Sequence, residues 1–141
     1  MKRCLVVDDS SVIRKVAGKI LRDSGFEVTE AENGCQAIEL CHHNLPDAIL
    51  LDWHMPEMGA YEFLEALAPL RKGAKPFVVY CTTENDRADL ARAYAAGADD
   101  YLLKPFDRRD LVAKFKPTVT LAGSSLETRV RADRGATVRR A

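Results

Sequence analysis

The stretch that decides the fold lies in the middle of the chain and reads Asp47-Ala48-Ile49-Leu50-Leu51-Asp52-Trp53-His54-Met55-Pro56. Four consecutive apolar residues between two aspartates are typical of a short strand that is buried on both faces, as in a parallel sheet. Pro56 then turns the chain away from the strand direction. Open parallel sheets bind ligands at the carboxyl ends of their strands, so the position of Asp52 predicts a functional carboxylate.

Strand and helix patterns alternate along most of the chain. Short apolar runs predict five strands, at Arg3–Val7, Phe26–Ala31, Asp47–Leu51, Pro76–Cys81 and Asp100–Leu103. Helical periodicity and capping residues predict five helices, at about 11–24, 34–43, 61–70, 85–96 and from 107 onward, the last ended or kinked by Pro117. These alternations predict an α/β protein with a (βα)5 flavodoxin-like fold of three layers and a parallel sheet in the order 2-1-3-4-5.

Length and composition exclude several classes of protein. The 141 residues suffice for one domain with a core, and 47% hydrophobic with 30% charged residues is ordinary globular composition. No apolar run approaches the roughly 18 residues that cross a bilayer, and the chain leads directly into a strand, so we expect neither membrane insertion nor a targeting segment. The cysteines lack CxxC spacing, and Cys4 and Cys81 fall in expected strands, which fits a reducing, cytoplasmic location.

Three carboxylates are expected to meet at the carboxyl edge of the sheet. Asp8 and Asp9 end the first expected strand and Asp52 ends the third, and these strands are neighbours at the switch point of the 2-1-3-4-5 order. Three carboxylates in one crevice repel each other unless a cation is present. Oxygen ligands with room for water molecules suit Mg²⁺, so the sequence predicts a magnesium site here.

Two further polar side chains follow strands that end at the same edge. Thr82 ends the fourth expected strand, and Lys104 follows the fifth. A metal ion, an ammonium and a hydroxyl around Asp52 would stabilise a phosphoryl group transferred to it, and Asp52 would be the nucleophile that forms an acyl phosphate. The competing interpretation is that each residue merely ends a strand. Their occurrence at matching strand ends favours phosphoryl transfer.

At these residues the chain resembles the receiver domain of bacterial two-component response regulators of the CheY-like type. The matching segments are Val7-Asp8-Asp9-Ser10, Leu51-Asp52-Trp53-His54-Met55-Pro56, Thr82-Thr83-Glu84, Gly97-Ala98 and Tyr101-Leu102-Leu103-Lys104-Pro105-Phe106. The resemblance covers about residues 2–116, and the motifs together are highly specific.

The resemblance implies a signalling protein rather than a metabolic enzyme. It implies that a sensor histidine kinase or a phosphotransfer protein phosphorylates Asp52 and that Lys104 pairs with the phosphoryl group. It further implies that Asp8, Asp9, Asp52 and the backbone carbonyl of His54 hold Mg²⁺ together with water molecules.

A conformational switch is also implied by the resemblance. Thr82 would hydrogen-bond to the phosphoryl group and draw the ring of Tyr101 inward, as the switch aromatic residue. That movement would alter the surface formed by the fourth helix, the fifth strand and the fifth helix. The bond between Lys104 and Pro105 would be cis, as is typical of the family.

The end of the chain differs in charge from the part that precedes it. Residues 1–116 carry 16 basic and 19 acidic residues, whereas residues 126–141 carry five arginines against Glu127 and Asp133. Residues 117–125 are uncharged and include Pro, Gly and a Ser pair, as in a linker. We therefore expect a receiver domain at 1–116, a linker at 117–125 and an arginine-rich ligand-binding tail at 126–141.

The choice of arginine over lysine in the tail points to a nucleotide ligand. The guanidinium fork suits contact with phosphate or with the guanine edge, and Asp133 could accept hydrogen bonds from guanine. The tail resembles the C-terminal extension of the CheY-like cyclic di-GMP effectors of alphaproteobacteria, which act on the flagellar motor and link the messenger to motility and surface attachment. That resemblance implies ligand contacts at Arg129, Arg131, Asp133, Arg134, Arg139 and Arg140, and a flagellar motor switch protein as partner.

Other interpretations of the tail stay open. It would be a solvated basic segment if the protein is a phospho-dependent chemotaxis-type regulator or a phosphorelay intermediate. It would show steep salt dependence and little base preference if it binds nucleic acid or an anionic surface. A DNA-binding output domain does not fit in so short a segment, so we do not expect DNA binding.

Overall fold

The computed structural model describes residues 2–53, 55, 58–83 and 87–120. Five parallel strands form one sheet in the order β2-β1-β3-β4-β5. The strands are β1 (Arg3–Val7), β2 (Glu27–Ala31), β3 (Ala48–Asp52), β4 (Phe77–Thr82) and β5 (Asp100–Leu103). The helices are α1 (Ser11–Asp23), α2 (Gly34–His43), α3 (Ala60–Leu67), the 3-10 turn η1 (Ala68–Leu70), α4 (Arg87–Ala96) and α5 (Arg108–Thr120). The predicted (βα)5 flavodoxin-like fold is confirmed.

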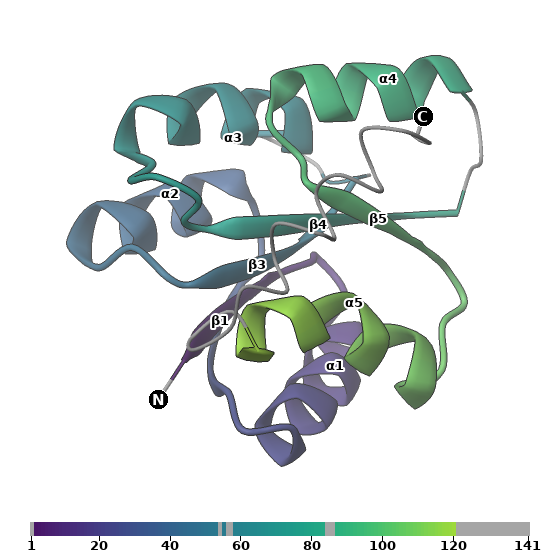
Figure 1. Ribbon diagram of the computed structural model, residues 1–141. Coiled ribbons are helices and arrows are strands. Elements are labelled where there is room, and N and C mark those ends of the chain that lie inside the picture. The colour runs from purple at the N-terminus through teal and green to yellow at the C-terminus, as the bar shows by residue number, and fades with distance from the viewer. Residues whose placement is uncertain (1, 54, 56–57, 84–86, 121–141) are drawn as a thin grey trace.

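The helices form two layers around the sheet. In Figure 1, α1 and α5 lie on one face of the sheet, and α2, α3 and α4 lie on the other. The apolar side chains divide in the same way into two clusters. Alternate residues of β3 point into opposite clusters, Ile49 into one and Leu50 into the other, so this strand is buried along its whole length.

Residues at the helix ends explain where the helices begin and end. The Ser10 hydroxyl accepts a hydrogen bond from the Ile13 N–H at 3.2 Å, and the Asn33 side chain accepts one from the Gln36 N–H at 2.9 Å. Gly97 follows α4 with a φ of +125°, a conformation that side chains with a Cβ rarely adopt.

Five strand ends differ by one residue from the predicted ranges, namely the first residue of β2 and both ends of β3 and β4. The last residues of β3 and β4 matter for the site. Asp52 is the last residue of β3, opposite Cys81 of β4, and not the first residue after the strand. The ladder extends this far because the Trp53 N–H donates to the Cys81 carbonyl oxygen at 2.8 Å. Likewise Thr82 is the last residue of β4, opposite Leu103.

Prolines account for two further differences. The helix predicted at 61–70 ends as an α-helix at Leu67 and continues only as the 3-10 turn, which contains Pro69, a residue without an N–H for the α-helical ladder. By contrast, α5 does not end at Pro117 and continues to Thr120.

All four cysteines are free thiols. Cys4 and Cys81 are buried, and burial raises the pKa of both thiols. None of the helices in the described ranges combines the length and the apolar character needed to cross a bilayer.

Candidate functional site

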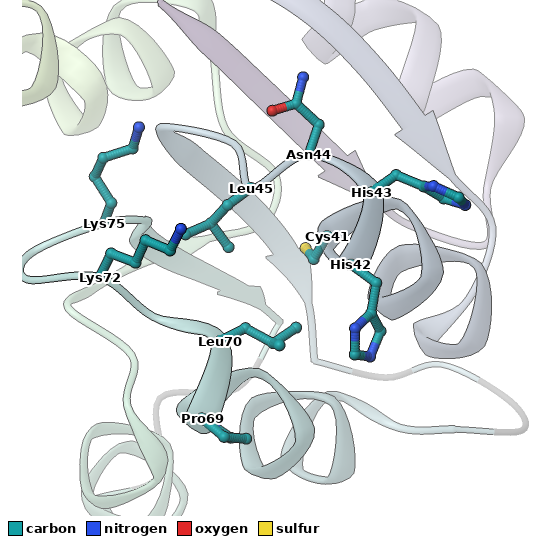
Figure 2. A pocket seen from close by; sticks show the side chains of 9 residues that line it. All are labelled: Cys41, His42, His43, Asn44, Leu45, Pro69, Leu70, Lys72 and Lys75. Atoms are coloured by element: carbon teal, nitrogen blue, oxygen red, sulfur yellow. The ribbon is translucent and has the colours of Figure 1, made fainter.

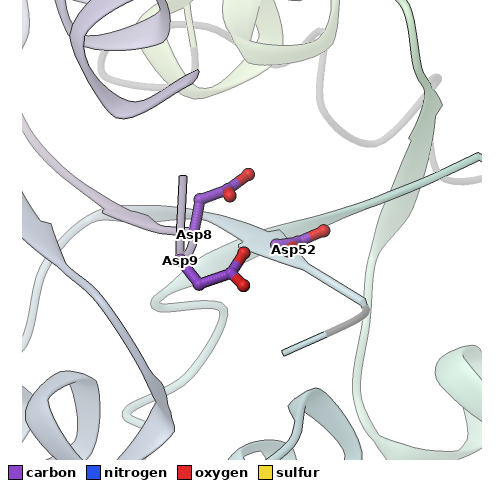
Figure 3. A group of neighbouring side chains, drawn as sticks. All are labelled: Asp8, Asp9 and Asp52. Carbon is purple, nitrogen blue, oxygen red and sulfur yellow. The ribbon is translucent and has the colours of Figure 1, made fainter. Parts of the chain in front are cut away.

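Three carboxylates meet at the carboxyl ends of β1 and β3. Oxygen atoms of Asp8, Asp9 and Asp52 all lie within 4.8 Å of one another. Asp8 and Asp52 are buried, with 3% and 4% of their surface exposed, whereas Asp9 is exposed. Figure 3 shows the three side chains reaching into the same space beyond the strand ends. The predicted convergence is therefore present in the structure.

Lys104 supplies a positive charge to this cluster. Its Nζ donates to Asp52 Oδ1 at 3.0 Å and to Asp8 Oδ2 at 3.2 Å. Burial disfavours the charged ammonium, but the hydrogen bond to Asp52 and the charges of Asp52 and Asp8 outweigh burial and raise the Lys104 pKa above its usual value. One ammonium balances only part of the charge of three carboxylates, and such an oxygen donor set fits a divalent cation.

Backbone contacts beside the cluster fix the positions of Lys104 and Thr82. The Lys104 N–H donates to the Thr82 carbonyl oxygen at 2.8 Å, which ties the end of β5 to the end of β4. The peptide bond between Lys104 and Pro105 is cis, as the resemblance implied. Thr82 is buried, with 3% of its surface exposed, on the strand next to the one that carries Asp52.

Tyr101 lies on β5, away from the carboxylates. It is half-buried, its ring centroid lies 6.3 Å from that of Tyr80, and Lys114 Nζ lies 5.3 Å from its centroid. The expected switch aromatic residue therefore lies on the strand next to the one that ends at Thr82, against the apolar cluster that contains Tyr80 and beside Lys114 of α5.

An aromatic cluster on β4 was not predicted. The Tyr80 ring lies 5.1 Å from Trp53, 6.4 Å from Tyr94 and 6.3 Å from Tyr101, measured between centroids. Its hydroxyl is buried and has no hydrogen-bond partner among the described residues, and burial raises its pKa. The sequence signal was one tyrosine inside an apolar strand, which by itself indicates only a core position.

Several predicted site residues lie outside the described residues. These are His54, whose carbonyl was expected to hold the metal, and the tail residues Arg129, Arg131, Asp133, Arg134, Arg139 and Arg140.

A second hollow lies at the opposite edge of the sheet. It has a volume of about 490 Å³ and is lined by the end of α2, by η1 and by the turn that precedes β4. Figure 2 shows that the imidazoles of His42 and His43 point in different directions, so they do not form a shared metal site with Cys41. The acidic cluster remains the stronger candidate for a functional site.

Comparison with known proteins identifies the family. The family described as "Response regulator receiver domain" matches residues 4–116. The chain belongs to this family. A receiver domain is a signalling unit that accepts phosphoryl groups, generally with Mg²⁺ at its acidic pocket, and its phosphodonor is a histidine kinase or a phosphotransfer protein.

Relatives of this receiver occur both alone and within larger proteins. It is 36% identical over 115 residues to the phosphate regulon transcriptional regulatory protein PhoB of Escherichia coli, covering 82% of this chain and 50% of PhoB. It is 38% identical over 123 residues to the transcriptional regulatory protein PrrA of Mycobacterium tuberculosis, covering 87% of this chain and 52% of PrrA. The chain thus spans about half the length of these curated relatives.

Two solved structures of CheY-like proteins resemble this chain over nearly their whole length. The chemotaxis protein CheY4 of Vibrio cholerae has a TM-score of 0.79 and 30% identity, covering 84% of this chain and 98% of CheY4. A CheY-like receiver domain from Methanospirillum hungatei has a TM-score of 0.78, also with 30% identity, covering 84% and 94%.

Proposed function

We propose that this receiver accepts a phosphoryl group on Asp52 from a sensor histidine kinase or a phosphotransfer protein. The observation that carries the proposal is the buried carboxylate of Asp52 at the end of β3, hydrogen-bonded by Lys104 within a cluster of three carboxylates. A carboxylate held in place by an ammonium, beside carboxylates that can hold a divalent cation, is suited to act as a nucleophile toward a phosphoryl group.

The chemistry is a displacement at phosphorus. An Asp52 carboxylate oxygen attacks the phosphorus atom of a phosphohistidine, the P–N bond breaks, and an acyl phosphate forms while the histidine leaves and takes up a proton. The Lys104 ammonium and the Thr82 hydroxyl stabilise the charge on the phosphoryl oxygens. We assign no further catalysis, so the protein acts as a signalling protein and not as a metabolic enzyme.

The acidic cluster fits Mg²⁺. Asp8, Asp9 and Asp52 supply carboxylate oxygens that lie within one coordination shell of each other, and the His54 backbone carbonyl is proposed as a further ligand. When bound, Mg²⁺ neutralises negative charge on the carboxylates and on the incoming phosphoryl group.

The response to phosphorylation is proposed to pass through Tyr101. Thr82 lies at the end of β4, and Tyr101 lies on the neighbouring strand with its ring against Tyr80. We propose that movement of Thr82 toward the phosphoryl group lets Tyr101 turn inward, which changes the surface of α4, β5 and α5.

Substitution of the nucleophile tests the proposal. The Asp52→Asn variant should show no labelling by acetyl phosphate with Mg²⁺ present, because an amide cannot form the acyl phosphate. Label that persists in this variant would refute the assignment of Asp52. A Lys19→Met variant, which changes an exposed lysine of α1, should be labelled like the unaltered protein.

For the tail we propose cyclic di-GMP as ligand and the flagellar motor switch as output, with control of motility and surface attachment. Support comes from the five arginines with Asp133 within residues 126–141, following the receiver at 1–116 and the uncharged linker at 117–125. The four free cysteines support a reducing, cytoplasmic location. The second candidate, a phospho-dependent chemotaxis-type regulator or phosphorelay intermediate with an inert tail, is favoured by the likeness to CheY4 over 98% of its length.

Calorimetric titration with cyclic di-GMP separates these functions. We expect binding by the full chain and none by a chain that ends at Ser125. Full chain that binds no cyclic di-GMP contradicts the effector proposal and leaves the second candidate, while equal binding by both chains moves the site away from the tail. If binding to the tail weakens steeply with salt and does not distinguish guanine nucleotides from others, the tail binds nucleic acid instead.

A further inference from the structure

Arg14 of α1 holds the loop that carries the metal-binding aspartates. Its Nη1 donates to the backbone carbonyl oxygen of Asp8 at 2.7 Å, and its Nε donates to Glu30 Oε1 of β2 at 3.1 Å. Only 13% of its side chain is exposed. We infer that Arg14 is a positioning residue that orients Asp8 and Asp9 toward a bound divalent cation. This inference rests on the magnesium site proposed above.

The carbonyl of Asp8 matters because a peptide unit is planar. The Asp8 carbonyl group, the Asp9 nitrogen and the Asp9 Cα lie in one plane, so a hydrogen bond that fixes the carbonyl also fixes the direction in which Asp9 leaves the backbone. Asp8 is also held at its other polar atoms. The Asp8 N–H donates to the Ala31 carbonyl oxygen at 3.1 Å, and Asp8 Oδ1 accepts from the Ser10 N–H at 2.9 Å.

Asp9 has less direct support than Asp8. It is exposed, and within the described ranges no hydrogen bond to its carboxylate is present. Its position therefore depends on the backbone that Arg14 anchors. Mg²⁺ demands near-ideal octahedral geometry, so an error in the position of one carboxylate lowers affinity more than it would for a cation with flexible coordination.

Glu30 completes the arrangement by orienting Arg14. It accepts from Arg14 Nε, which leaves Nη1 aimed at the Asp8 carbonyl group. Glu30 Oε2 also lies 3.9 Å from Arg22 Nη2, and the side chain of Arg22 is 51% exposed. Arg22 thus shares the helix, the charge and the carboxylate partner of Arg14 but is not bonded to the loop, so it provides a matched control.

Charge and positioning predict opposite effects of removing Arg14. A guanidinium near a cation site repels the cation, so a neutral side chain should strengthen Mg²⁺ binding if charge alone matters. If Arg14 positions the aspartates, its removal should weaken binding despite that gain. The direction of the change therefore separates the two roles.

The experiment is a calorimetric titration of the full chain with MgCl₂. We expect Arg14→Met to weaken Mg²⁺ binding by about 10-fold or more, the range found for residues that orient metal ligands. Arg14→Lys, which keeps the charge but loses the fork, should be intermediate. Arg22→Met should stay within about twofold of the unaltered chain, because an exposed charge contributes little. Labelling of Arg14→Met by acetyl phosphate should recover when Mg²⁺ is raised to saturation.

Two outcomes overturn the inference separately from the proposed function. Unchanged or tighter Mg²⁺ binding by Arg14→Met overturns it while the magnesium site stands, and so does an equal loss in Arg22→Met. An unaltered chain that binds no Mg²⁺ overturns the magnesium site and this inference together. If Arg14→Met loses its cooperative thermal transition, Glu30→Gln decides: it should bind Mg²⁺ several-fold more weakly, and unchanged binding overturns the inference.

Discussion

At the scale of single residues, Lys104 balances two buried carboxylates. Replacing it by methionine removes two charged hydrogen bonds and leaves Asp8 and Asp52 facing each other. We expect the free energy of unfolding to fall by about 1–3 kcal/mol without divalent cations, measured by urea denaturation in EDTA. Added Mg²⁺ should reduce the difference in free energy of unfolding between Lys104→Met and the unaltered chain. An equal loss in Lys19→Met, which affects an exposed pair with Asp23, would contradict this explanation.

Asp47 gives a pH-dependent prediction at the same scale. Burial opposes its charge, but the Arg3 N–H at 2.8 Å and the Lys75 ammonium at 3.0 Å lower the Asp47 pKa below its usual value. A carboxyl group with a lowered pKa contributes stability that is fully present above its unfolded pKa of about 3.9 and is lost as pH falls through its folded pKa.

The Asp47→Asn variant tests this contribution. It should be less stable than the unaltered chain at pH 7 by about 1–2 kcal/mol, and the difference should shrink below pH of about 4. Urea denaturation at several pH values measures both quantities. A difference that is constant down to pH of about 2 would show that the charge of Asp47 has no part in the effect.

At the scale of elements, α5 is held to the sheet by aromatic edge contacts. Phe115 is 1% exposed, and its ring centroid lies 6.0 Å from that of Phe26 and 6.4 Å from that of Phe77. We expect Phe115→Ala to lower the free energy of unfolding by about 3–5 kcal/mol, because it opens a cavity between α5, α1 and the sheet. Val12→Ala, which truncates a side chain that is 67% exposed, should change stability little. Similar losses in both variants would argue against this packing.

Element positions could be predicted from the sequence, but some element ends could not. The apolar run of β3 identified the sheet, since no polar residue interrupts it. The ends of β3 and β4 were each wrong by one residue, because the last ladder bonds depend on neighbouring strands far away in the sequence. The α-helical end at Leu67 follows from Pro69, whose effect on the helix was underestimated.

The site shows the same division between local and long-range information. Asp8, Asp9, Asp52 and Lys104 were predicted because each lies at the end of a recognisable strand or just after it. Arg14 was not predicted, since its role depends on a backbone carbonyl six residues before it and on Glu30 in another strand. No local sequence pattern marks this contact, in contrast to the hydrogen bond by which Ser10 caps α1.

At the scale of the whole molecule, the receiver should fold without the tail. The family match ends at residue 116, and residues 126–141 contain few large apolar side chains. We expect a chain that ends at Ser125 to keep its free energy of unfolding within about 0.5 kcal/mol of the full chain, measured by urea denaturation. A larger loss would show that the tail packs on the receiver and would change how the cyclic di-GMP titration is interpreted.

The two proposed inputs can also be tested for coupling. If phosphorylation of Asp52 changes the affinity for cyclic di-GMP by some factor, cyclic di-GMP must change the phosphorylation equilibrium by the same factor. Titration of the chain with and without the phosphoryl analogue beryllofluoride measures the first quantity. Equal affinity in both states would show two independent inputs on one chain.

The aromatic cluster has a spectroscopic consequence. Trp53 is the single tryptophan of the chain, it follows Asp52 directly, and its ring lies 5.1 Å from that of Tyr80. Tryptophan fluorescence of the chain therefore comes from a single position beside the acidic cluster. The tyrosines packed against Tyr80 can transfer excitation energy to Trp53. Cation binding at the aspartates and rotation of Tyr101 should each alter that emission in its own way, so the protein carries an optical sensor of both events without any label.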